Sequence, residues 1–280
     1  MFQQISHIRS LGLATIFKTY LSACGLYHEL RRKPDGTSHS GRLAFILGRM
    51  VLKTFSITNG ALEADTLRYI RAHTTIPVPR VYASAEGYGR RYLLMQAIEG
   101  DCLEDVWKDL DDAQKDSIVE SLRSYISQLR ALPPPYGRKV CALYGEGVRD
   151  GRITSSGPVG PFLDEASFND YLVDAAEIFM DETTLPGIRA RMREDHRIVF
   201  THGDLAPRNI MVKDGKVAAI IDWEQSGWYP EHWEMVKAMW NPMDRKDLSW
   251  NNRIIAMFSE EDKKDWMVDR ELSDHLVGGF

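Results

Sequence analysis

Three polar side chains stand close together in the segment THGDLAPRNIMV, at residues 201–212. Asp204 follows His202 by two positions, and Asn209 follows five positions after Asp204. Carboxylate and amide oxygens are ligands that Mg²⁺ accepts, with water and phosphate oxygens completing its shell. A neighbouring carboxylate can take the proton from a hydroxyl nucleophile. Phosphoryl transfer needs this set of groups, although the same side chains could simply satisfy amides in a turn.

The residues after this segment predict a β-hairpin that brings a fourth polar group to the site. Two apolar runs, at 210–212 and 217–221, flank an Asp-Gly dipeptide at 214–215. This dipeptide is typical of two-residue hairpin turns. The hairpin would place Asn209, just before the first strand, beside Asp222, just after the second. The sequence therefore predicts an amide and a carboxylate side by side, as a metal site would require.

A phosphate donor also needs a cation, and the stretch MVLK supplies a candidate. Lys53 ends this apolar run, and Glu63 follows ten residues later in a predicted helix. A strand lysine paired with a glutamate on the next helix can hold the phosphates of a nucleotide. Alone the pattern is weak, but it gains support from the polar groups further along the chain.

Hydrophobic periodicity predicts a small β-rich half with one helix, followed by a larger helical half. A loop of about thirty residues, rich in Gly, Pro and Ser, runs to Phe162 and could be a binding loop, a lid or plain surface loop. The predicted elements are a hairpin over 42–55, a helix over 61–73, strands at 80–83 and 91–97, and helices over 113–132, from 168 and over 233–276.

Composition excludes several functional classes. The 280 residues are 44% apolar and 27% charged, which is typical of a globular protein. A net charge of -5 argues against nucleic-acid binding, and no apolar run reaches the roughly 20 residues that span a bilayer. Three cysteines without a CxxC pair indicate a reducing, cytoplasmic location. The patterns carry no signal for oligomeric state.

The first 28 residues contain no acidic residue. Ile5, Ile8, Ile16, Tyr20 and Leu21 recur near helical spacing, which favours a helix packed on the body of the protein. A mitochondrial transit peptide is the alternative, because such peptides are amphipathic and poor in acids.

Several motifs together resemble the aminoglycoside phosphotransferase and choline kinase group of small-molecule kinases, and most of all fungal members with no known substrate. The resemblance extends from about residue 42 to 240. The motifs that carry it are VLK at 51–53, Glu63, IPVPRVY at 76–82, LLM at 93–95, HGDLAPRN at 202–209 and IIDWE at 220–224.

This resemblance implies an α+β, two-lobed protein-kinase-like fold. Residues 1–41 would form a helical extension and linker, residues 42–97 a nucleotide-binding N-lobe with a small antiparallel sheet and one helix, and residues 98–280 a mainly helical C-lobe. The implied activity is transfer of a phosphoryl group from ATP, with Mg²⁺, to a hydroxyl group of a small molecule.

The resemblance also implies a role for each site residue. Asp204 would be the catalytic base, and Asn209 and Asp222 would hold Mg²⁺. His202 would brace the catalytic loop. The residues that would bind the nucleotide are Lys53 at the phosphates, Glu63 orienting Lys53, and the backbone of Met95, Ala97 and Ile98 as a hinge facing adenine.

The sequence departs from the group in one respect, because no glycine-rich loop precedes Phe45. This departure leaves open a catalytically inactive, kinase-like binding or scaffold protein. A third hypothesis is a metal-dependent hydrolase using His202, Asp204 and Asp222, although such sites usually contain more nitrogen ligands.

Overall fold

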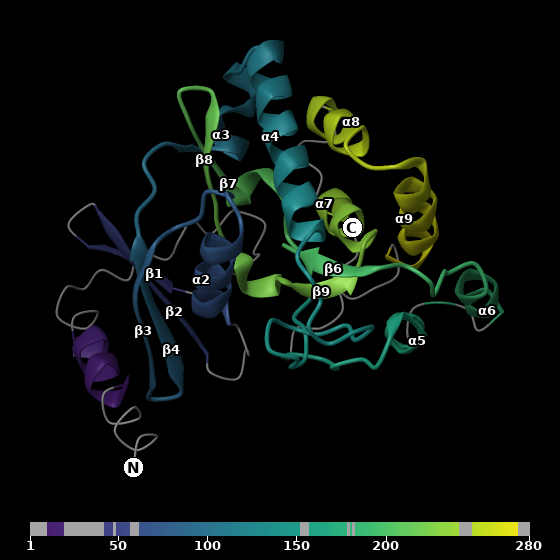
Figure 1. The fold of residues 1–280 in the computed structure, drawn as a ribbon, viewed down its shortest axis with the longest axis horizontal. Coiled ribbons are helices and arrows are strands. Elements are labelled where there is room, and N and C mark those ends of the chain that lie inside the picture. The colour runs from purple at the N-terminus through teal and green to yellow at the C-terminus, as the bar shows by residue number, and fades with distance from the viewer. Residues whose placement is uncertain are drawn as a thin grey trace.

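The computed structural model describes residues 10–19, 42–46, 49–56, 62–151, 157–177, 180, 183–240 and 248–273. It has two lobes, a smaller one built on an antiparallel sheet and a larger one made mostly of helices (Figure 1). The predicted α+β, two-lobed fold is confirmed. No helix among the described residues is long and apolar enough to cross a membrane.

The N-lobe sheet has the order β1-β2-β4-β3, and all of its neighbouring strands are antiparallel. The β1–β2 hairpin is as the sequence predicts, and Ile46 pairs with Met50 across its turn. Only residues 47–49 connect these two strands. The elements of this lobe are β1 (Arg42–Ile46), β2 (Met50–Ser56), α2 (Glu63–His73), β3 (Val81–Gly87) and β4 (Arg90–Gln96).

Alternation along β2 divides the N-lobe sheet into two apolar faces, because successive side chains of a strand point to opposite sides. Val51 and Phe55 join the main core, whereas Leu52 belongs to a smaller cluster with Ala85 and Tyr92. The main core continues through α2 into the C-lobe, so the face that carries Lys53 is the one turned toward the other lobe.

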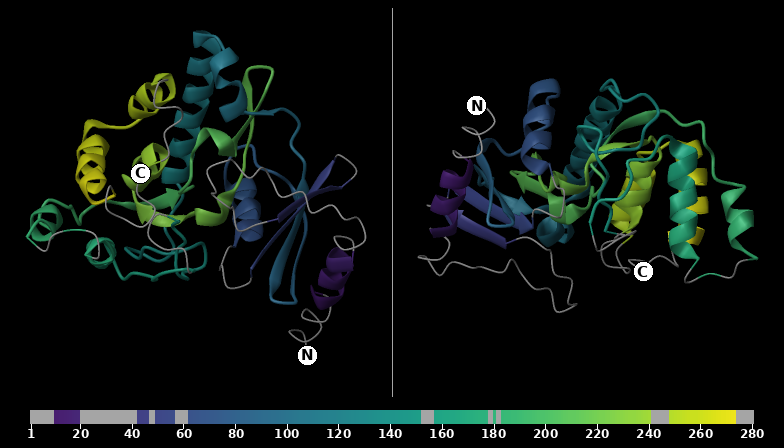
Figure 2. Two further views of the ribbon diagram at one scale, coloured as in Figure 1. Left: turned by 180° about the vertical axis from the view of Figure 1, so that it is seen from behind. Right: turned by 90° about the horizontal axis from the view of Figure 1, so that it is seen from below.

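Residues 10–19 form a helix that covers the outer face of the N-lobe sheet, on the side away from α2 (Figure 2). Ala14 and Phe17 are buried there, and the Phe17 ring lies 6.0 Å from the Tyr92 ring. The packed helix was predicted correctly, but its buried face was not. Ile16, expected in the contact, is 63% exposed. The expected positions 5, 8, 20 and 21 lie outside the described residues.

The first long helix of the C-lobe, α4, has a well-defined N-terminal cap. The Asp111 side chain accepts a hydrogen bond from the Gln114 amide, and the Gln114 side chain accepts one from the Asp111 amide. This capping box fixes the start of α4 where the sequence predicts it. The first C-lobe elements are β5 (Asp101–Cys102), α3 (Leu103–Val106), η2 (Trp107–Asp109), α4 (Asp112–Arg130), α5 (Glu165–Ala176) and α6 (Leu185–Arg189).

The remaining elements carry the segment singled out in the sequence. The β7–β8 hairpin turns at Asp214 and Gly215, both with positive φ, as an Asp-Gly turn should. It brings the Ile221 amide within 2.9 Å of the Asn209 carbonyl oxygen. These elements are β6 (Ile198–Thr201), η3 (Pro207–Asn209), β7 (Ile210–Lys213), β8 (Lys216–Ile220), η4 (Trp223–Gln225), β9 (Gly227–Pro230), α7 (Trp233–Trp240), α8 (Ser249–Ile255) and α9 (Glu260–Ser273).

The long loop between α4 and α5 is tied to the body of the C-lobe at several points. Isolated β-bridges join Val140 to Phe162, Val148 to Val159, and Cys141 to Trp228. These bridges attach the described parts of the loop, residues 133–151 and 157–163, to each other and to β9. Trp228 itself is 1% exposed, and its aromatic neighbours in sequence are equally buried, so these rings pack the core.

A buried histidine joins three helical elements at the far side of the C-lobe. His196, just before β6, contacts Glu165 of α5 through Nδ1 at 2.6 Å and Asp265 of α9 through Nε2 at 2.9 Å. Its backbone N–H also donates to Glu165 at 3.0 Å. The His232 ring, just before α7, lies 4.4 Å away. Three chain segments that are distant in sequence are therefore fixed around one side chain.

Candidate active site

Lys53 lies at the centre of an ion cluster that joins the two lobes. Its Nζ donates to Glu63 of α2 at 2.6 Å and to Asp222, after β8, at 2.7 Å. A Glu224 oxygen lies 3.7 Å from the same nitrogen. Burial alone would lower the pKa of the ammonium, but Asp222, Glu63 and Glu224 raise it well above its ordinary value. Lys53 is therefore a fixed positive charge between the lobes.

Glu63 is the buried partner of this lysine. Its side chain is 1% exposed, and burial raises the pKa of its carboxyl to about 7 against the lowering effect of Lys53. The pair joins β2 to the first turn of α2, ten residues along the chain. The sequence predicted this contact, and the structure forms it.

Asp204 lies in the loop between β6 and η3, with both carboxylate oxygens engaged. Arg208 Nη2 donates to Oδ1 at 2.5 Å, and Asn209 Nδ2 donates to Oδ2 at 2.8 Å. Asn209 Nδ2 also donates to the Asp204 carbonyl oxygen at 2.8 Å. Because the Asn209 nitrogen faces Asp204, its side-chain carbonyl oxygen is the atom left to ligate a cation.

Asp222 follows β8 with a left-handed backbone, at φ 64° and ψ 61°. This conformation is costly for a residue other than glycine, and it concentrates at functional sites. The Asp222 carboxylate lies against Lys53, and its oxygens lie within 4.8 Å of those of Glu63 and Glu224. The group offers oxygen ligands of the kind Mg²⁺ prefers.

His202 is hydrogen-bonded through both ring nitrogens. Nδ1 accepts from the Asp204 amide at 3.1 Å, and Nε2 donates to the Ile221 carbonyl oxygen at 3.1 Å. Burial lowers the pKa of the ring, so it is neutral. This geometry places His202 as a tie between the loop and the end of β8. The metal-dependent hydrolase is disfavoured, because neither nitrogen is available to a metal.

Sequence reasoning missed Glu234, which holds the loop at residues 202–203 through two backbone amides. Glu234 of α7 is 3% exposed and accepts hydrogen bonds from the backbone amides of His202 at 2.6 Å and Gly203 at 3.3 Å. Burial raises the pKa of Glu234 to about 7, while the two amides act to lower it. An acid in a first helical turn ordinarily indicates capping, so the sequence gave no reason to connect it with residues 202–203.

The predicted hinge is partly engaged within the sheet. The Ala97 amide donates to the Arg49 carbonyl oxygen at 3.0 Å, and the Gln96 amide donates to the Arg80 carbonyl oxygen at 2.9 Å. Met95 is paired on both sides, with Val51 and Val81. An adenine ring would thus have to use other backbone groups of this stretch, such as those of Ile98, or displace the Ala97 bond.

A second residue not anticipated from the sequence is Arg149, in the long α4–α5 loop. Its Nη1 lies 3.6 Å from Glu224, which places a second cation beside the Lys53 cluster. More than seventy residues separate Arg149 from Glu224 in the chain, and no local pattern links them. Hydrogen bonds from the Tyr229 hydroxyl to the Arg149 carbonyl oxygen and from the Gly151 amide to Gln225 hold this part of the loop beside η4 and β9.

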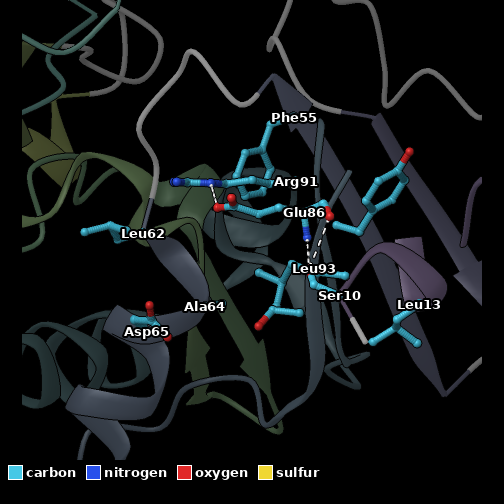
Figure 3. A pocket seen from close by; sticks show the side chains of 12 residues that line it. Ser10, Leu13, Phe55, Leu62, Ala64, Asp65, Glu86, Arg91 and Leu93 are labelled. Carbon is cyan, nitrogen blue, oxygen red and sulfur yellow. Dashed lines mark hydrogen bonds and ion pairs between the residues drawn. The ribbon is translucent and has the colours of Figure 1, made fainter. Parts of the chain in front are cut away.

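A cavity of about 430 Å³ lies in the N-lobe, away from these groups (Figure 3). It is lined by Ser10 and Leu13 of the N-terminal helix, by the start of α2, and by β3 and β4. Figure 3 shows Arg91 paired with Glu86 at its edge, at 2.5 Å. Asp204, Asn209 and Asp222 do not line it, so this cavity is separate from the candidate active site.

Comparison with known proteins gives the same assignment. Residues 32–271 match the model of the phosphotransferase enzyme family. An aminoglycoside 3'-phosphotransferase of Escherichia coli is 25% identical over 222 residues, which cover 77% of this chain and 73% of that protein. An aminoglycoside 3'-phosphotransferase of Enterococcus faecalis is 42% identical over 55 residues, which cover 18% of this chain and 21% of that protein.

Solved structures of similar fold include the ADP-bound aminoglycoside phosphotransferase APH(2'')-Ib, with a TM-score of 0.62 at 11% identity, covering 92% of this chain and 86% of that one. A thermostable mutant of APH(4)-Ia in a ternary complex with ADP and hygromycin B has a TM-score of 0.58 at 15% identity, covering 92% of this chain and 90% of that one. At these identities the likeness concerns the fold, while the family match covers most of the chain. The chain therefore belongs to the phosphotransferase enzyme family and is a small-molecule kinase with the protein-kinase-like fold.

Proposed function

We propose that the protein transfers the γ-phosphoryl group of ATP, in the presence of Mg²⁺, to a hydroxyl group of a small molecule. The observation that carries this proposal is the buried Lys53 ammonium, held between Glu63 of one lobe and Asp222 of the other. A fixed cation beside a carboxylate cluster is the arrangement that a metal-bound triphosphate requires. The ADP-containing structures of similar fold support ATP as the donor.

The residues present fit a magnesium ion. Asp222 supplies a carboxylate, and Asn209 supplies a side-chain carbonyl oxygen whose nitrogen is already turned toward Asp204. These hard oxygen donors leave most of the coordination shell to water and phosphate, as Mg²⁺ prefers. When bound, the ion would neutralise charge on the phosphate oxygens. Lys53 would contact the same phosphates, and Glu63 would keep Lys53 in place.

Asp204 is the base in this proposal. Asn209 and Arg208 hold the two carboxylate oxygens in position, and each oxygen has a further lone pair with which to accept the proton of an incoming hydroxyl. His202 and Glu234 fix the backbone on which Asp204 stands. The contribution of the protein is then mainly positioning and charge neutralisation.

The acceptor is proposed only by class, as a small molecule with a free hydroxyl. Aminoglycosides are the first compounds to test, because the curated relatives carry that name. Two acids of the stretch at 101–112, which could attract such polycations, have other partners in this structure. Asp111 caps α4, and Asp112 pairs with Arg253 at 2.8 Å.

The experiment is a screen of hydroxyl-bearing metabolites and aminoglycosides coupled to ADP release. Asp204→Asn should abolish turnover of any substrate found while ATP binding, measured by calorimetry, stays within about threefold of wild type. Asp195→Asn, which removes an exposed carboxylate near β6, serves as the matched control and should leave turnover unchanged. Full activity in the Asp204→Asn variant would refute the assignment of the base.

A catalytically inactive binding protein is the second candidate, because no glycine-rich loop precedes Phe45 in the sequence. Calorimetry of the wild-type protein with ATP and Mg²⁺ separates the two. Binding accompanied by ADP release supports the kinase. Binding without turnover across the whole screen, or no binding at all, supports the scaffold.

A further inference from the structure

Arg149 places an unsatisfied donor at the edge of the proposed phosphate site. Its side chain is 20% exposed, and its Nη1 atom is buried without a hydrogen-bond partner in the part of the chain that the structure describes. The nearest anion is a Glu224 oxygen at 3.6 Å, which is too long for a hydrogen bond. A buried donor left unpaired is destabilising, so a ligand that accepts a hydrogen bond from this atom would be bound more favourably.

The same Glu224 oxygen relates Arg149 to the lysine of the site. It lies 3.6 Å from Arg149 Nη1 and 3.7 Å from Lys53 Nζ, so both cations lie beside one carboxylate oxygen. Lys53 comes from the N-lobe and Arg149 from the C-lobe. A phosphate group that reaches Lys53 therefore lies close to the guanidinium as well.

The backbone around Arg149 is held rigidly. The Tyr229 hydroxyl donates to the Arg149 carbonyl oxygen at 3.3 Å, and the Gly151 amide donates to the Gln225 side chain at 3.3 Å. Between them, Asp150 forms a 2.6 Å ion pair with Lys237, and both side chains are about 1% exposed. These contacts attach the loop to η4 and α7, so the backbone that carries Arg149 is held in place before any ligand arrives.

The N-lobe gives a reason why a cation from the other lobe would be needed. Among the described residues of this lobe, Lys53 is the cation in the site, and its Nζ is already paired with Glu63 and Asp222. Charge on the transferred group must then be balanced by other donors. Arginine suits this task because its planar guanidinium matches phosphate oxygens and stays charged.

We propose that Arg149 donates hydrogen bonds to the phosphoryl group during its transfer, as an arginine supplied from within the same chain. This inference rests on the proposed function. In the step, the bond between the γ-phosphorus and the bridging oxygen of ADP breaks, and a bond to the acceptor oxygen forms. The acceptor proton passes to Asp204. Arg149 forms no covalent bond and transfers no proton, and it balances charge on the non-bridging oxygens.

The test uses ADP with Mg²⁺ and aluminium fluoride, which mimics a phosphoryl group in transfer and requires no known acceptor. Calorimetry on the full chain would measure ADP affinity with and without the fluoride. Wild type should bind ADP more tightly when fluoride is present. In Arg149→Met, the increase in ADP affinity caused by the fluoride should be at least tenfold smaller than in wild type, while the affinity for ADP alone changes less than threefold. Arg149→Lys should show an intermediate increase.

Arg191→Met is the control, because Arg191 is half exposed and pairs with Glu271 far along the chain. It should bind both forms like wild type, and circular dichroism should show that all variants are folded. An undiminished fluoride gain in Arg149→Met, or no gain in wild type, overturns the role of Arg149. Weaker binding of ADP alone, with the gain preserved, also overturns it. Failure of wild type to bind any nucleotide would instead overturn the proposed function itself.

Discussion

The buried His196 cluster should make the stability of this protein fall as the pH rises through the range 6.5 to 9. Burial alone would lower the pKa of the imidazole, but the hydrogen bonds that it donates to Asp265 and Glu165 raise its pKa to about 9. Two other groups face the cluster, namely Arg193, 3.7 Å from Asp265, and His232, whose pKa is lowered by burial and by His196. His232 therefore stays neutral and does not replace the charge on His196.

The sign and size of the effect follow from linkage. The ordinary pKa of this histidine is 6.5 and its folded value is about 9, so the folded state binds the proton more tightly. The contribution is fully present below pH 6.5 and is lost as the pH rises through 9. At about 1.4 kcal/mol for each pKa unit, the contribution is about 3 kcal/mol.

His196→Gln removes this charge and leaves Glu165 and Asp265 without their cation. At pH 6 we expect the variant to be less stable than wild type by about 3 kcal/mol or more, since an unpaired buried carboxylate is costly. The difference in free energy of unfolding between wild type and variant should narrow by about 3 kcal/mol between pH 6 and pH 10, because the wild-type histidine loses its proton over this range. Urea denaturation at each pH unit measures both quantities.

His73→Gln provides the control, because His73 is exposed at the end of α2 and its ring contacts only local groups. Its stability curve should run parallel to that of wild type across the same range. A His196→Gln curve that is also parallel to wild type, within about 1 kcal/mol from pH 6 to 10, would refute the linkage argument.

Three further predictions concern the active site. Glu234→Ala leaves the buried amides of His202 and Gly203 without an acceptor, and should lower the free energy of unfolding by about 2 kcal/mol or more in urea. Gly203→Ala should be destabilising and reduce turnover, because φ is +77° and the added Cβ would lie 2.5 Å from the Gln225 carbonyl oxygen. Lys53→Met should weaken ATP binding by at least tenfold in calorimetry, since it removes the cation from the site. An unchanged value in any of these measurements contradicts the corresponding role.

Local signals in the sequence were sufficient for the N-lobe elements, for α4 and for the β7–β8 hairpin, but not for β6, β9 or α6, nor for the division of residues 233–276 into α7, α8 and α9. The Asp214-Gly215 turn fixed the β7–β8 hairpin, and the hairpin set Asn209 and Asp222 at its open end. The cap at Asp111 located the start of α4. Each of these signals depends on residues a few positions apart, whose backbone geometry is set by turn and cap chemistry.

Groups that reach the site from distant segments could not be predicted in this way. Glu234 meets its partner amides across about thirty residues, and Arg149 meets Glu224 across more than seventy. Both contacts depend on how α7 and the α4–α5 loop pack, which periodicity does not report. The N-terminal helix shows the same limit, because its contact with Gly87 uses the small side chain of Ala14 rather than the larger Ile16.

The helix at residues 10–19 also bears on where this protein can be cut. The family match starts at residue 32, so a fragment chosen by that match would lack the helix. Leu52, Ala85 and Tyr92, now at most 5% exposed, would then meet water on the outer face of the sheet. Burying such side chains contributes about 1.5–3 kcal/mol for each large one, and exposed apolar patches promote association. Recombinant fragments should therefore begin ahead of residue 10.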